Sequence, residues 1–156
     1  MRLTEDIYLV GSAEFGLSNA YDCHVYLLDG GEEATLIDCG VGYDTGQIIR
    51  NIEKYIDIEK VKKVYLTHLH ADHCGGGRDL QELGIEIVAP RNEWEDMQAH
   101  PDEVREAYEI SRNSGCYPEG KEFIFPNPDV YVTDGEELKV GKYTLRCIEL
   151  RGHSAG

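Results

Sequence analysis

Short apolar runs separated by turn residues open the chain, as in antiparallel β structure. The runs at 7–10, 22–28 and 35–37 are rich in branched and aromatic residues, which favour strands. Asp29-Gly30-Gly31 separates the second run from the third and is typical of a tight turn. We therefore expect three short strands, with a hairpin between the second and the third.

The spacing of apolar residues then changes from that of a strand to that of a helix. Asp44 and Gln47 have the spacing of a capping box, and apolar residues follow at helical spacing as far as Ile56. The next expected elements are a strand at 61–66, a short helix at 78–83 ending at Gly84, and a strand at 85–89. This alternation predicts a βαβ unit with a right-handed crossover.

The C-terminal part is predicted to contain both helices and strands. Residues 91–114 have a mainly helical pattern interrupted at Pro101, and 114–129 are rich in Gly and Pro, which indicates a long loop. Strands are expected at 130–132, 137–140 and 143–150. We interpret 1–156 as one α/β (α+β) domain, because no linker, repeat or low-complexity tract divides it.

Composition and charge narrow the functional classes. Of the 156 residues 41% are hydrophobic and 29% charged, as in soluble globular proteins. The net charge of −15 repels phosphate backbones, so we expect no nucleic-acid partner and favour a small-molecule substrate. No apolar run approaches the roughly 20 residues that span a bilayer, so no membrane association is expected. The N-terminus lacks a secretory signal pattern, and the five irregularly spaced cysteines favour reduced thiols, so we predict a cytoplasmic protein.

A dense group of metal-type side chains follows the strand expected at 61–66. The stretch 67–76 reads Thr-His-Leu-His-Ala-Asp-His-Cys-Gly-Gly. In an extended chain His68 and His70 point to the same side and can reach one ion, while Asp72 and His73 follow where the backbone turns. Imidazole and carboxylate ligands suit zinc, iron or manganese. A packing role does not account for this cluster, since unpaired polar groups brought together would be costly to desolvate.

The sequence resembles the metallo-β-lactamase superfamily. Residues 67–76 match its H-x-H-x-D-H-x-G-G motif, 35–40 resemble the strand and D-x-G turn before it, and 152–156 resemble the later G-H-S/T-x-G. The resemblance implies a metallo-β-lactamase-like αββα sandwich, of which the chain holds the first half plus the start of the second. It also implies zinc as the cofactor, as one or two ions, with iron or manganese as alternatives.

The resemblance also assigns roles to residues. His68, His70 and His153 correspond to the ligands of a first metal, and Asp72 and His73 to ligands of a second. Asp72 also corresponds to the family's catalytic aspartate, which orients hydroxide and handles protons. Asp38 would support the metal loop through hydrogen bonds without touching the ion. The later bridging aspartate and last histidine of the family have no counterpart, so the domain is expected to be incomplete at its C-terminus.

The resemblance favours a metal-dependent hydrolase acting on a small ester, thioester or amide, with a glyoxalase-II-like thioesterase or lactonase as the best match. One alternative is an iron-dependent persulfide dioxygenase, whose motif is also H-x-H-x-D-H. Another is a metal-binding partial domain that needs a partner. An exposed sheet edge would then favour a homo-oligomer.

Overall fold

The computed structural model describes residues 1–120 and 122–154. The last two positions of the expected G-H-S/T-x-G motif, Ala155 and Gly156, lie outside the described residues. The main sheet contains β1 (Ile7–Gly11), β2 (Val25–Asp29), β3 (Ala34–Ile37), β4 (Val61–Tyr65), β5 (Glu86–Pro90) and β6 (Val130–Val132), and a separate hairpin contains β7 (Glu137–Val140) and β8 (Tyr143–Arg146).

The six strands of the main sheet are arranged in chain order. β1, β2 and β3 are antiparallel neighbours, whereas β3, β4, β5 and β6 run parallel to one another. Both the antiparallel opening and the parallel strands of the predicted βαβ unit are therefore confirmed. The parallel strands end at one edge of the sheet, and the histidine cluster follows the end of β4 at that edge.

Helices connect the parallel strands. They are α1 (Thr45–Ile52), the 3-10 helix η1 (Ile58–Lys60), α2 (Ala71–Cys74), α3 (Gly77–Gln81), α4 (Arg91–Ala99) and α5 (Pro101–Asn113). The predicted cap of α1 is present, because the Asp44 side chain accepts a hydrogen bond from the Gln47 amide. Pro101 starts α5, where its missing N–H costs nothing. Among the described residues, no helix is both long and apolar enough to cross a membrane.

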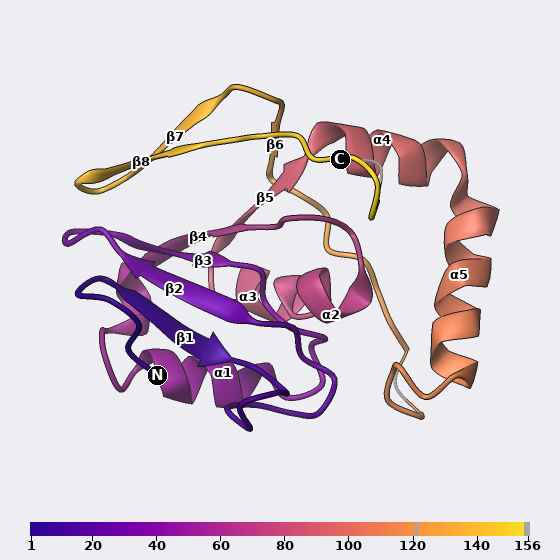
Figure 1. The fold of residues 1–156 in the computed structure, drawn as a ribbon, viewed down its shortest axis with the longest axis horizontal. Coiled ribbons are helices and arrows are strands. Elements are labelled where there is room, and N and C mark those ends of the chain that lie inside the picture. Colours follow the sequence, from indigo (N-terminus) through magenta and orange to yellow (C-terminus); the bar gives the residue numbers. More distant parts are fainter. Residues whose placement is uncertain (121, 155–156) are drawn as a thin grey trace.

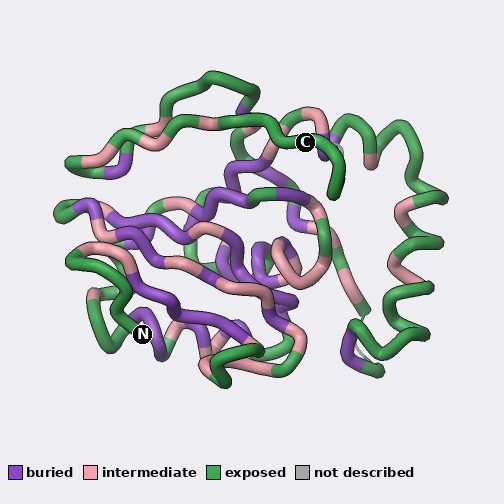
Figure 2. The backbone as a smooth tube through the Cα atoms, viewed as in Figure 1, coloured by how far each residue is buried: buried purple, intermediate pink, exposed green. Residues whose placement is uncertain are grey.

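Two apolar layers lie on opposite faces of the sheet. Alternate strand residues such as Leu36 and Val64 join Ile48 of α1 and Leu80 of α3 in the main core. Their neighbours along the strands, such as Tyr65, pack instead with the β7–β8 hairpin. Figure 1 shows the hairpin above the sheet, and Figure 2 shows the buried residues concentrated in the central strands and exposed residues dominating α5.

Three element boundaries differ by three residues or more from those predicted. The strand expected from 22 begins at Val25, because its pairing with β1 ends at Gly11 and the Asp22 side chain instead accepts a hydrogen bond from the Val41 amide. The strand expected over 143–150 ends at Arg146, which pairs with the first residue of β7. The helix expected to reach Ile56 ends at Ile52 in a turn.

Candidate metal centre

The metal-type residues lie in the loop and short helix that follow β4. His68 and His70 are in the extended segment after the strand, and His70 immediately precedes α2. α2 then carries Asp72 and His73. The strand end thus delivers the two histidines together, and one helical turn presents the other two residues beside them.

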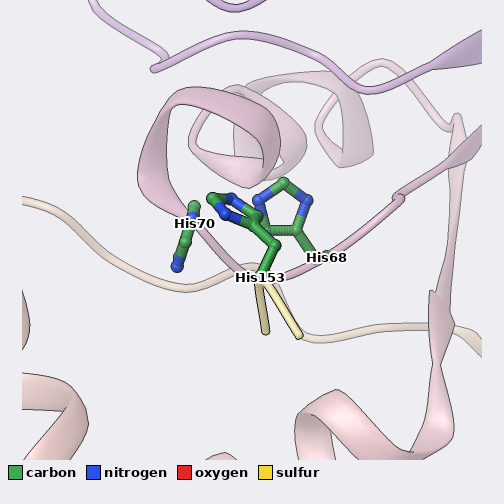
Figure 3. Close-up of side chains that lie close together, drawn as sticks. All are labelled: His68, His70 and His153. Atoms are coloured by element: carbon green, nitrogen blue, oxygen red, sulfur yellow. The ribbon is translucent and has the colours of Figure 1, made fainter. Parts of the chain in front are cut away.

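Three histidines converge although one is far away in sequence. Each of His68, His70 and His153 offers a ring nitrogen within 4.8 Å of those of the other two. The ring centroids are 4.5 Å apart for His68 and His70, 4.9 Å for His68 and His153, and 4.7 Å for His70 and His153. Figure 3 shows the rings grouped face to edge, with His153 reaching in from the C-terminal segment.

The chemistry of these three residues fits a metal ion. His68 is 7% exposed, and its Nε2 is buried without a hydrogen-bond partner. Buried polar atoms in proteins are nearly always paired, so an unpaired imidazole nitrogen among other imidazoles is the arrangement a metal would satisfy. The other ring nitrogen, Nδ1, lies 2.9 Å from the Thr67 hydroxyl, which holds the ring in place.

Burial and neighbouring imidazoles keep His68 and His70 neutral. Burial and the nearby His73 and His70 lower the pKa of His68 to about 4. Burial and His153 also lower the pKa of His70. Neutral imidazole is the form that binds metals, so at neutral pH these rings need lose no proton to do so.

A second group of ligand-type atoms adjoins the first. Cys23, Asp38 and His73 each offer one atom, and these atoms lie within 4.8 Å of one another. His73 Nδ1 is 2.7 Å from Asp38 Oδ2, while its Nε2 is 3.4 Å from Asp72 Oδ2. Burial alone would lower the pKa of His73, but the hydrogen bond to Asp38 and the two carboxylate charges outweigh burial and raise it.

Asp38 lies behind the metal loop. It accepts hydrogen bonds from the Thr67 amide (2.8 Å) and the Thr67 hydroxyl (2.9 Å), besides its contact with His73. Its backbone has a φ of 61°, a left-handed conformation that is uncommon outside glycine. Strained positions of this kind are concentrated at functional sites, and here the strain turns the carboxylate toward the loop.

Cys23 was not identified from the sequence as part of the site. It lies just before β2, in a segment expected to be a strand, and its amide donates a hydrogen bond to the Asp72 carbonyl (3.3 Å). No spacing in the sequence links it to His73. Only the contact between two loops distant in the chain brings them together.

Three other metal-type side chains lie outside both clusters. His24 contacts Ser12 (3.1 Å) and Glu14 (3.4 Å). Cys74 is fully buried and donates to the Leu69 carbonyl. His100 lies at the junction of α4 and α5.

Comparisons with known proteins identify a family and relatives for this chain. Residues 19–156 match the family described as Metallo-beta-lactamase superfamily. A hydroxyacylglutathione hydrolase of Rhizobium etli is 26% identical over 98 residues, which cover 62% of this chain and 27% of the relative. BJP-1, a subclass B3 metallo-beta-lactamase of Bradyrhizobium japonicum, is 26% identical with a TM-score of 0.70, covering 100% of this chain and 53% of that one. A metallo-beta-lactamase family protein of Thermus thermophilus is 25% identical with a TM-score of 0.71, covering 99% of this chain and 55% of that one.

The chain thus spans about half the length of these solved relatives. The coverage agrees with the expected first half of an αββα sandwich plus the start of the second, which corresponds here to the main sheet and the β7–β8 hairpin. The converging histidines, the fold and the match over most of the sequence lead to one conclusion: the chain belongs to the metallo-β-lactamase superfamily.

Proposed function

We propose that this protein is a metal-dependent hydrolase of small ester, thioester or amide substrates. The observation that carries the proposal is the convergence of three imidazoles, one of which has a buried and unpaired nitrogen. Three protein ligands leave an open position on a tetrahedral ion, which distinguishes catalytic from structural zinc sites. Iron and manganese accept the same ligands and remain the alternatives to zinc.

His68, His70 and His153 would hold the first ion, and Asp72 and His73 would contribute to a second. A bound zinc ion supplies Lewis acidity, which lowers the pKa of water and polarises an acyl carbonyl. Asp38 fixes the orientation of His73 through the 2.7 Å contact with its Nδ1, leaving Nε2 directed toward Asp72.

Asp72 is the residue proposed to handle protons. Its side chain is 44% exposed and lies next to His70 at the start of α2, so water and substrate can reach it. A partly exposed carboxylate near neutral imidazoles can orient a water molecule and accept its proton during attack on a carbonyl. The proton can then pass to the leaving group.

The substrate class is supported by the named relatives. The hydroxyacylglutathione hydrolase of Rhizobium etli and the metallo-beta-lactamase of Bradyrhizobium japonicum are both named for hydrolysis at an acyl group. We propose a glyoxalase-II-like thioesterase or a lactonase, with β-lactam hydrolysis as a further arm of the test. Since the chain covers about half of the solved relatives, this activity is proposed for the chain together with whatever completes its site.

Elemental analysis tests the metal centre. The chain is purified without added metal, and we expect about one tightly bound zinc ion per chain. A His68→Ala variant should lose most of this metal, whereas a His24→Ala variant, altered outside both clusters, should retain it. Equal metal content in all three proteins would contradict the proposed site.

A substrate panel tests the chemistry. The zinc-loaded protein, in a form that includes whatever completes its site, is offered a thioester, a lactone and a β-lactam. Hydrolysis of at least one is expected, with loss in Asp72→Asn. Failure on all three would refute the proposed hydrolase. Bound iron together with oxygen uptake on a persulfide would instead support the dioxygenase alternative.

A further inference from the structure

A cavity of about 640 Å³ adjoins the candidate metal centre. His70 and Asp72 line it on the side of the metal centre, and residues of the loop before β2, of α4, of α5 and of the segment after α5 line other parts. Residues of α5 line the cavity, and Figure 1 shows this helix at the end of the molecule, beyond α2. Pockets of about 300–1,000 Å³ are typical of small-molecule sites, so this one can hold a substrate whose reacting bond lies at the histidines.

One wall of the cavity is aromatic. Tyr108, Tyr117, Phe123 and Phe125 line it. Their rings are in contact, with centroids 5.0 Å apart for Tyr108 and Tyr117 and 4.5 Å apart for Phe123 and Phe125. The Phe123 amide donates to the Tyr108 hydroxyl (3.2 Å), which fixes the segment after α5 against the helix. Such a wall offers apolar and π-face contacts to a ligand.

One ring of the wall is deeply buried. Tyr117 is 2% exposed, and burial together with the hydroxyl of Tyr108 beside it raises its pKa, so the Tyr117 hydroxyl stays protonated. The only tryptophan, Trp94, packs in the main core and not in this wall.

The formally charged side chains of the lining are acidic. Asp22, Glu93, Asp96 and Glu103 line the cavity in addition to Asp72, whereas no lysine or arginine is among its described lining residues. Asp22 is 6% exposed; its Oδ1 accepts from Val41, but its Oδ2 is buried without a partner. Asp96 and Glu103 are exposed at the outer wall, and the nearby base is His100, 3.3 Å from Asp96.

We propose that this cavity selects substrates in which an apolar or aromatic body carries an ammonium group. The body packs against the aromatic wall, and the ammonium group lies near Asp96 and Glu103, where ring faces add cation–π attraction. An anionic group at this outer end of the cavity is disfavoured, because the carboxylates there repel it and the net charge of −15 adds to the repulsion. The inference rests on the proposed function for the position of the reacting bond, but the charge preference is a property of the cavity itself.

The charge preference is therefore tested first without metal or catalysis. Phenethylamine, an ammonium ion at neutral pH, is compared with phenethyl alcohol, which has the same body and no charge. Binding to the metal-free 156-residue chain is followed by amide chemical shifts in NMR. We expect the amine to bind about 3- to 10-fold more tightly, since two exposed charge pairs contribute modestly each, and the shifts to map to residues lining the cavity. Equal affinities, or shifts elsewhere, would overturn the proposal.

Matched variants separate the cavity from the general field of the protein. The double variant Asp96→Asn, Glu103→Gln should reduce the preference to less than about 2-fold. Glu106→Gln changes an exposed carboxylate that is also on α5 but does not line the cavity, and it should keep the preference. An equal loss in Glu106→Gln would mean that net charge alone attracts the amine, and would overturn the assignment to this cavity.

A kinetic arm distinguishes failure of this inference from failure of the proposed function. The zinc-loaded protein is given acetylthiocholine and its uncharged carbon analogue as thioester substrates. Preference for the charged thioester, lost in the double variant, supports the inference. Equal cleavage of both overturns the inference and leaves the hydrolase intact. Cleavage of neither, with the NMR preference retained, counts against the hydrolase and not against the cavity.

Discussion

The Nδ1 atom of His73 lies 2.7 Å from Oδ2 of Asp38, across 35 residues of sequence. This contact joins the turn after β3 to α2, the helix after β4. These two segments meet at the edge of the parallel sheet. Because the same carboxylate also accepts hydrogen bonds from Thr67, one acidic group orients both the start and the end of the metal loop.

Asp38→Asn should weaken metal binding while leaving the fold intact. Asparagine tolerates the left-handed backbone at this position, but it removes the charge that holds His73. Loss of such supporting contacts typically costs about 10- to 100-fold in metal affinity. Zinc affinity is measured by competition with a chromophoric chelator. Asp44→Asn is the matched control, since it makes the same chemical change at the N-cap of α1. Aspartate and asparagine both cap helices well, so this variant should leave the zinc affinity unchanged.

Gly75→Ala should destabilise the protein. A Cβ at this position would lie 2.3 Å from the Val41 carbonyl oxygen and 2.6 Å from that of Ala71, and neither backbone atom can move freely. Overpacking of this kind costs about 1–3 kcal/mol in unfolding free energy, which urea denaturation measures.

Gly46→Ala is the matched control for that change. Gly46 lies in α1, and its added Cβ would meet flexible side-chain atoms of Arg50 and Asp44 at 3.2 and 3.3 Å. Alanine is favoured over glycine in helices by up to about 1 kcal/mol, so stability should be unchanged or increased. An equal loss of stability in both variants would contradict the prediction that the Val41 carbonyl oxygen leaves no room for a Cβ at position 75.

Much of the local structure and of the metal cluster could be predicted from the sequence, because both depend on residues close together in the chain. The two-residue period placed His68 and His70 on one side of an extended segment, and their rings are indeed adjacent. The predicted end of the last strand was wrong, since pairing depends on where β7 begins and not on the apolar residues Ile148 and Leu150, which are 67% and 75% exposed.

Contacts between distant segments account for what the sequence could not reveal. Cys23 meets His73 only because the loop before β2 packs on α2, and no local spacing signals this. No local spacing marks Tyr108 and Tyr117 as part of a site, and only the folded chain shows them lining one cavity. Residues whose role depends on a loop-to-loop contact are therefore the ones that sequence reasoning misses.

Cysteine reactivity should follow burial. All five cysteines are free, and only Cys116 is exposed. Burial raises the pKa of Cys39 and Cys74 well above the ordinary range of thiols, so the reactive thiolate is scarce at both. With iodoacetamide at about neutral pH, Cys116 should be alkylated first and Cys39 and Cys74 only after unfolding. Mass spectrometry of the metal-free chain in buffer and in denaturant checks this, and early modification of Cys74 would contradict the packing around α2.

The β7–β8 hairpin should loosen in acid, because Asp6 is one of the carboxylates that connect it to the N-terminal part of the chain. Asp6 accepts a hydrogen bond from the Tyr143 hydroxyl (2.6 Å) and pairs with Lys142. The Lys142 ammonium group, and then the Tyr143 hydroxyl, hold the pKa of Asp6 below its usual value. The folded state therefore binds this proton less readily than the unfolded state does. The resulting stabilisation is complete above the unfolded pKa of about 3.9 and is lost as the pH falls through the lower folded pKa.

Asp6→Asn tests that connection. At neutral pH the variant should unfold at lower urea concentration than the parent chain, because its amide cannot pair with Lys142 as a charge. The difference between the two proteins should shrink as the pH falls below about 4, where the parent carboxylate takes up a proton. Glu59→Gln removes an exposed carboxylate at η1, far from the hairpin in sequence, and should leave this pH dependence as in the parent. A difference between Asp6→Asn and the parent that stays constant from neutral to acidic pH would mean that the charge of Asp6 does not hold the hairpin.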